Sequence, residues 1–151
     1  MHQFGMNMSE LDALLVCLGN CGGAAAWPCL LHKLKTLPEE AEFSHVRALT
    51  MSIESLYARC PNGDVAPIVA SILDREGYQG HVQLDVSDAQ SALSENINEN
   101  RVRDDTLREL HLARLLFHCG DHGQRGEVLL RQYAKDCRGH FARHANALLS
   151  R

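Results

Sequence analysis

The sequence predicts an all-α protein, a right-handed α-α superhelix of about three helix pairs followed by a C-terminal helix. Apolar residues recur at helical spacing along most of the chain, and only residues 81–86 alternate as a strand would. Only 5% of the residues are aromatic although 45% are hydrophobic, so the core must consist of small aliphatic side chains, which suits closely packed helices. With 151 residues, we expect a single helical-repeat domain, 1–151.

The first helix pair is predicted between residues 11 and 37. Its first helix has an apolar stripe at i, i+3, i+4 and i+7, formed by Leu11, Leu14, Leu15 and Leu18. Gly22 and Gly23 end this helix. The second helix covers 27–37, with Pro28 in its first turn, where a missing N–H costs little, and Pro38 just beyond its end.

The second pair is predicted between residues 46 and 77. The stripe of its first helix is Val46, Leu49, Ile53, Leu56 and Tyr57, and residues 60–63 break it. The next helix has Asp64 at the N-cap position and Pro67 in its first turn, and Gly77 stops it.

A polar stretch, residues 78–106, is predicted to be an insertion or long loop containing one short helix over 88–94. Long loops in compact domains often carry function, so this insertion is where a lid or catalytic site would lie if the chain were an enzyme. Its acidic residues are Asp85, Asp88, Glu95 and Glu99. An ordinary solvated loop is the alternative.

Three further helices follow the insertion. The first, 107–119, is apolar on two sides, which predicts that it lies between neighbouring helices. The other two cover 124–135 and 138–149. The last helix carries one apolar face, formed by Phe141, Ala145, Leu148 and Leu149.

The helix pairs can be superimposed on one another. A shift of 39 places Leu14 on Ile53, Cys21 on Cys60 and Pro28 on Pro67, and a shift of 59 places Cys60 on Cys119. A helix, a short turn with Gly, and a second helix with an early Pro, at about 40 residues per unit, resemble HEAT or armadillo repeats. The resemblance covers residues 11–135, although Ala25 and Gln124 stand where Asp64 would recur.

This resemblance implies a protein-protein interaction scaffold or accessory module that binds a peptide or partner domain on a concave face. The second helix of each pair usually lines that face. The partner-binding positions expected there are Lys33, Lys35, Ser71, Arg75, Arg131 and Lys135. A homodimer, or docking on a larger protein, would cover the ends of so short a stack.

A second resemblance concerns residues 112–121 and 130–149, which are similar to helical domains that trail bacterial FAD-dependent oxidoreductases. It implies an accessory module of an oxidoreductase. The chain lacks the Gly-x-Gly-x-x-Gly motif that would hold a dinucleotide, so we expect no flavin, no other cofactor and no enzymatic activity of its own.

Two groups of Cys and His residues could bind zinc. Cys137, His140 and His144 are spaced to share one flank of the last helix, and His118, Cys119 and His122 lie at the end of another. The alternative is that the cysteines are small packing residues, because Cys119 corresponds to Cys60 and Cys21 in the repeat. We favour that alternative, also for the pair Cys17 and Cys21, and expect no metal.

A Cys119 nucleophile beside His118 or His122 is conceivable but has no orienting third group.

The charge is divided along the chain, whose net charge is -4. Residues 1–100 contain 5 basic and 13 acidic side chains, whereas residues 101–151 contain 10 and 6. A basic ridge for a nucleic acid is conceivable on the last helices. It would comprise Arg125, Arg131, Lys135, Arg138 and Arg143. The acidic balance of the chain makes this alternative the weaker one.

No secretory signal and no apolar run long enough for a membrane span are recognisable, which predicts a cytoplasmic protein without membrane contact. The six cysteines are then expected to be reduced.

Overall fold

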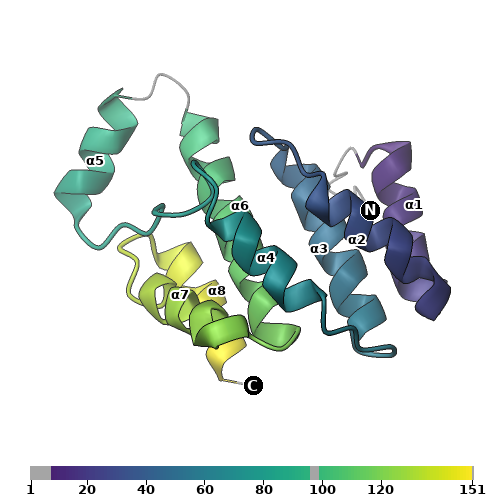
Figure 1. The fold of residues 1–151 in the computed structure, drawn as a ribbon. Helices are drawn as coiled ribbons and strands as arrows, with labels where there is room; N and C mark the ends of the chain where they lie inside the picture. The colour runs from purple at the N-terminus through teal and green to yellow at the C-terminus, as the bar shows by residue number, and fades with distance from the viewer. Residues whose placement is uncertain (1–7, 96–98, 151) are drawn as a thin grey trace, which may run out of the picture.

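The computed structural model describes residues 8–95 and 99–150, which form eight α-helices and no strand (Figure 1). The helices are α1 (Glu10–Cys21), α2 (Trp27–Lys35), α3 (Phe43–Tyr57), α4 (Val65–Leu73), α5 (Val86–Glu95), α6 (Glu99–His118), α7 (Arg125–Tyr133) and α8 (Gly139–Leu149). Short 3-10 helices at 24–26 and 122–124 lead into α2 and α7. The all-helical prediction is thereby confirmed.

The helices α1, α3 and α6 lie side by side in that order. α2 packs on α3 and α4, and α4 packs on α6 (Figure 1). α7 lies against α6, and α8 against α7. α6 therefore contacts α3, α4 and α7, which confirms that a helix with two apolar sides lies between neighbours. None of the described helices combines the length and the apolar character needed to cross a membrane.

Helix ends follow the local sequence in most places. The N–H of Gly22 donates to the carbonyl of Leu18 at 2.8 Å and closes α1, and Pro28 and Pro67 fall in the first turns of α2 and α4 as predicted. Asp64 is the N-cap residue of α4, as predicted, although its side chain makes no capping hydrogen bond.

α4 also ends earlier than predicted, at Leu73 rather than at Gly77. Residues 74–79 form turns after the helix. Gly77 belongs to these turns and adopts a φ of 79°, a left-handed conformation that glycine adopts without the usual steric penalty.

The predicted stripe of α1 is only partly buried. Leu15 is 3% exposed, but Leu14 is 67% and Leu11 is 44% exposed. α1 packs mainly on α3, so a single neighbour covers it and the rest of its apolar surface faces outward. The stripe expected from spacing is therefore wider than the face that tertiary packing covers.

The predicted insertion, 78–106, is shorter than expected. Its short helix is present as α5, and residues 99–106 form the first turns of α6 rather than a loop. Ion pairs at helical spacing stabilise this polar start of α6, since Asp105 pairs with both Arg101 and Arg108. Arg108 is itself buried and donates to the carbonyl of Ala41 at 3.1 Å.

Residues near 80 are held by a buried carboxylate. Glu109 is fully buried and accepts hydrogen bonds from the backbone N–H groups of Gly80 and His81, at 3.0 and 2.8 Å, and from the Tyr133 hydroxyl at 2.7 Å. Burial and the adjacent Glu109 raise the pKa of Tyr133, which keeps this hydroxyl a donor. This part of the insertion is thus anchored to α6 and α7.

Several side-chain hydrogen bonds join residues about 40 positions apart. Arg59, after α3, donates to the carbonyl of Gly19 at 2.6 Å, and Arg75, after α4, donates to the carbonyl of Lys35 at 3.2 Å. The Tyr78 hydroxyl donates to the carbonyl of Pro38 at 2.5 Å. Residues that follow α3 and α4 are therefore bonded to residues at or just after the ends of α1 and α2.

Candidate functional site

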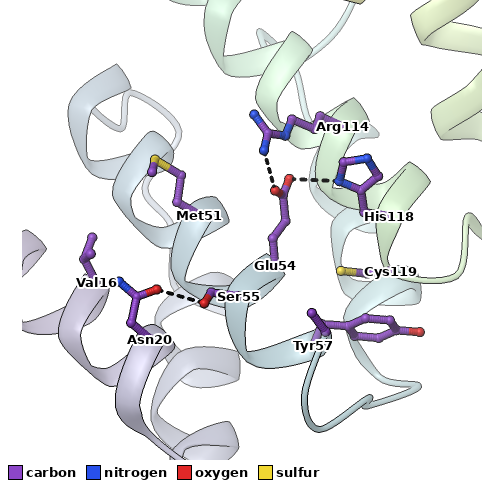
Figure 2. Close-up of a pocket in the computed structure, with 10 residues that line it drawn as sticks. Val16, Asn20, Met51, Glu54, Ser55, Tyr57, Arg114, His118 and Cys119 are labelled. Atoms are coloured by element: carbon purple, nitrogen blue, oxygen red, sulfur yellow. Dashed lines mark hydrogen bonds and ion pairs between the residues drawn. The ribbon is translucent and has the colours of Figure 1, made fainter. Parts of the chain in front are cut away.

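A groove of about 420 Å³ lies over α3, between α1 and α6 (Figure 2). α1 contributes Val16 and Asn20, and α6 contributes Arg114, His118 and Cys119. The rest of the lining comes from α3 and the residue that follows it. The groove is thus a product of three helices that lie far apart in the sequence.

The charged centre of the groove is Glu54 of α3. Arg114 Nη2 donates to Glu54 Oε2 at 2.8 Å, and His118 Nδ1 lies 3.7 Å from Glu54 Oε1. Arg114 and His118 are one helical turn apart, so both side chains project from the same face of α6 toward this carboxylate (Figure 2). The Glu54 side chain is 13% exposed, whereas those of Arg114 and His118 are 27% and 31% exposed.

One end of the groove is polar and is cross-linked to α1. The Ser55 hydroxyl donates to Asn20 Oδ1 at 2.8 Å, and Arg59 donates to the Ser55 hydroxyl at 3.2 Å. Arg59 also donates to the carbonyl of Gly22 at 3.0 Å. These bonds fix the end of α1 against α3 and place the Arg59 guanidinium at the rim.

Apolar surface lies beside the charged centre. Met51, one turn before Glu54 on the outer face of α3, is 40% exposed, and Val16 and Tyr57 are among the other apolar residues of the lining. The groove therefore combines one exposed thioether side chain with an ion pair.

Two histidines, His111 and His144, interact electrostatically with Arg114. The ring centroids of His111 and His144 are 6.1 Å apart, and burial together with the positive charge of Arg114 lowers the pKa of His111 to about 4. The pKa of His144 is also lowered, for the same two reasons. Among the described residues, Arg114 Nε and His144 Nε2 are buried atoms without a hydrogen-bond partner.

Cys119 lines the groove but is 1% exposed. Burial and the negative charge of Glu54 raise the pKa of its thiol to about 12. A nucleophilic cysteine needs the thiolate, which this environment disfavours. The structure therefore places a packing cysteine here, and the hypothesis of a Cys119 nucleophile finds no support.

The other cysteines divide between core and surface. Cys60 packs partly buried against the core, but Cys17 and Cys21 of α1 are exposed. Their interpretation as core residues is wrong, because no helix covers that side of α1 among the described residues. All six cysteines are free thiols.

Neither candidate zinc group is assembled. Cys137 precedes α8, so it does not share a flank of that helix with His140 and His144, and its thiol points to the carbonyl of Asp85 at 3.7 Å. His144 instead faces His111. The described part of the chain brings together no three His, Cys, Asp or Glu side chains that could hold a metal ion.

In the second group, the three residues have different surroundings. Cys119 is buried, His118 faces Glu54, and His122 lies in the 3-10 helix at 122–124.

The six predicted partner-binding positions lie on or just after α2, α4 and α7, away from the residues that line the groove. Arg75 is engaged with the carbonyls of Leu37 and Lys35, and Arg131 pairs with Glu127 at 2.6 Å. The Ser71 hydroxyl donates to the carbonyl of Ile68. Lys33 is half-buried, and Lys35 and Lys135 are exposed.

The acidic residues of the insertion do not form a site. Asp85 accepts hydrogen bonds from the backbone N–H and the hydroxyl of Ser87 at the start of α5, and both bonds lower its pKa. Asp88 lies in the first turn of α5. The side chains of Glu95 and Glu99 fall outside the described part of the structure.

Three members of the predicted basic ridge are engaged within the chain. Arg125 pairs with Asp74 at 2.7 Å, Arg131 with Glu127 at 2.6 Å, and Arg138 with Asp136 at 2.7 Å. Lys135 and Arg143 are exposed. A ridge of this kind offers a polyanion fewer free cations than the sequence alone predicts.

A partly buried Asp–His pair was not anticipated from the sequence. Asp12 of α1 is 4% exposed, and its Oδ1 lies 2.5 Å from Nδ1 of His45 in α3. The two residues are far apart in the sequence, as are Glu54 and Arg114, so helical spacing could not reveal either pair. The one local signal for the groove was the i, i+4 spacing of Arg114 and His118.

We compared the chain with protein-family models, with curated proteins and with solved structures, and none of them matches it.

Proposed function

We propose that this chain is a protein-interaction module built from stacked HEAT-like helix pairs, and that the groove over α3 receives a segment of a partner protein. The observation that carries the proposal is the groove itself, in which exposed Met51 lies beside the Glu54–Arg114 ion pair. Protein interfaces combine apolar contacts with a few oriented charges, and Met and Arg are enriched in them.

The stacking of helix pairs is supported by the hydrogen bonds between residues about 40 positions apart. In a repeat stack, each unit contacts only its neighbours, and equivalent residues of adjacent units lie close together. Arg59 on Gly19 and Arg75 on Lys35 follow this rule with the same separation. The longer separation of Arg114 from Glu54 reflects the insertion before α6.

The groove differs from the second-helix surface expected from the HEAT resemblance. Arg75 and Arg131, which are expected there, have partners within the chain, as Arg114 has in the groove. We propose the groove as the main binding surface because it is concave and contains exposed Met51, and the positions Lys35 and Ser71 as the alternative surface that the same experiment tests.

The test is affinity capture with two matched variants. Met51→Asp places a charge on the apolar side of the groove, whereas Leu84→Asp makes the same change at a 66% exposed residue outside it. We expect a stoichiometric partner to bind the wild type and Leu84→Asp, and to bind Met51→Asp about ten-fold more weakly or worse. Quantitative mass spectrometry of the captured proteins gives the comparison.

A photo-crosslinking residue in place of Met51, and separately in place of Ser71, then identifies the contacting face. Crosslinking from position 51 supports the groove as the partner-binding surface. Partners that bind Met51→Asp at full strength and crosslink only from position 71 would contradict it. A flavin-dependent oxidoreductase as the groove-dependent partner would assign the accessory role implied by the C-terminal resemblance.

A further inference from the structure

The groove and its rim carry a small excess of positive charge, although the chain as a whole has a net charge of -4. Among the described residues that line the groove, Glu54 is the one acidic residue and the Arg114 guanidinium balances its charge. Arg59 at the rim donates to carbonyls and to a hydroxyl, so its positive charge is in excess. A concave surface with an excess of one sign attracts a ligand of the opposite sign. The charge of the groove therefore favours an acidic ligand.

One terminal nitrogen of Arg114 makes no hydrogen bond within the part of the chain that the structure describes. The other donates to Glu54, and Figure 2 shows the free terminal nitrogen pointing away from that carboxylate. Nε also has no described partner, but it is buried, so only the terminal nitrogen can reach a ligand. A guanidinium group pairs favourably with a carboxylate or a phosphate, so the outer terminal nitrogen of Arg114 is suited to an anionic group of a ligand.

The apolar lining favours a protein segment as the class of ligand. Met51, Val16 and Tyr57 offer contacts that an aliphatic side chain can fill. A nucleic acid would instead need a row of cations along its phosphates, and three arginines of the C-terminal helices are engaged by Asp74, Glu127 and Asp136. The groove thus fits an acidic peptide better than it fits a polyanion.

We infer that the groove over α3 binds an acidic segment of a partner protein, in which a carboxylate pairs with Arg114 and a neighbouring aliphatic side chain packs on Met51. This inference rests on the proposed docking function and adds the chemistry of the partner. Glu54 has a second role in this arrangement, because it competes with the incoming carboxylate for Arg114.

Three labelled peptides test the inference: one of alternating Glu and Leu, one in which Gln replaces Glu, and one in which Lys replaces Glu. We expect fluorescence anisotropy to show binding of the Glu peptide, about ten-fold or more above the Gln peptide, and weakening in high salt. The Lys peptide should not bind. A labelled single-stranded oligonucleotide serves as the polyanion control.

Opposite effects are expected from two variants of the ion pair. Arg114→Gln should weaken binding of the Glu peptide about ten-fold, and Glu54→Gln should strengthen it, because the competing carboxylate is removed. A folding defect cannot produce such a gain. Arg131→Gln, at an exposed arginine that pairs with Glu127 outside the groove, should leave the affinity unchanged.

The outcomes separate this inference from the proposed function. Equal binding of the Glu and Gln peptides, with loss of both in Met51→Asp, overturns the acidic chemistry and keeps the docking groove. Tighter binding of the oligonucleotide than of the Glu peptide, an equal loss in Arg131→Gln, or no peptide binding at all also overturns the inference. Crosslinking from position 51 still decides the docking function.

Discussion

At the scale of single residues, buried polar side chains hold the loops of this protein in place. Glu109 is a typical surface residue by type, yet it is fully buried and accepts three hydrogen bonds. For Asp136, burial and hydrogen bonding have opposite effects on the pKa of the carboxyl group. Burial raises its pKa, but hydrogen bonds from Arg138 and from the backbone of Gln83 outweigh burial, and the pKa lies below its ordinary value.

Histidine burial predicts a loss of stability in mild acid. His111 has a pKa of about 4 in the folded protein, against about 6.5 when unfolded, so the unfolded state takes up the proton first. We expect the free energy of unfolding to fall as the pH drops from 6.5 to 4, by up to about 3 kcal/mol, and to be insensitive to His111 above pH 7. His144 should add an effect of the same sign.

Urea denaturation as a function of pH measures this effect. His111→Leu removes the titrating group and should flatten the dependence between pH 6.5 and 4, whereas His122→Gln, at an exposed histidine, should not. An unchanged pH dependence in His111→Leu would show that other groups cause the acid sensitivity.

At the scale of helices, the position of α1 depends on a close approach to α3. A Cβ atom added at Gly19 would lie 2.4 Å from the Cα atom of Ser52, which is too close for any real contact. The buried face of α1 therefore consists of Asp12, Leu15 and Gly19 rather than of the full leucine stripe. Backbone proximity decides which leucines are covered.

Gly19→Ala should therefore loosen the α1–α3 contact. We expect a loss of about 1–3 kcal/mol in the free energy of unfolding, because the helices must move apart to admit the methyl group. Gly23→Ala is the matched control, since a Cβ there would meet nothing within 4 Å, and its effect should stay below about 1 kcal/mol. Equal effects in denaturant titrations would mean that the helices do not pack as closely as described.

At the scale of the whole molecule, α6 organises the fold because it contacts α3, α4 and α7. α1 packs mainly on α3 and exposes Leu11 and Leu14, and α5 lies apart from the other helices in Figure 1. The described helices thus form a well-covered middle with less covered elements outside it. Local opening is cheapest where few apolar contacts must be broken.

Native-state hydrogen exchange should show this gradient. We expect the amides in the middle of α6 and α3 to exchange slowest, those of α1 to exchange faster, and those of α5 to exchange fastest. Slow exchange throughout α5, comparable with that of α6, would contradict this arrangement and would indicate that another chain covers α5.

The sequence by itself determined the helical class, the approximate extent of most helices and their stop signals. These features depend on residues within one or two turns of each other, as with Pro28 and Pro67 in first turns and Gly22 at the end of α1. The apolar face of α8 belongs to the same group. Phe141, Ala145 and Leu148 recur at helical spacing and are all buried.

Only the tertiary structure decided which side of α1 is covered and which charges meet. Glu54 with Arg114, and Asp12 with His45, are joined by packing of helices that helical spacing cannot relate. Periodicity reports a preferred face within one helix, whereas a groove or a buried ion pair requires the position of its neighbours. For that physical reason, the groove over α3 became recognisable only when α1, α3 and α6 were placed side by side.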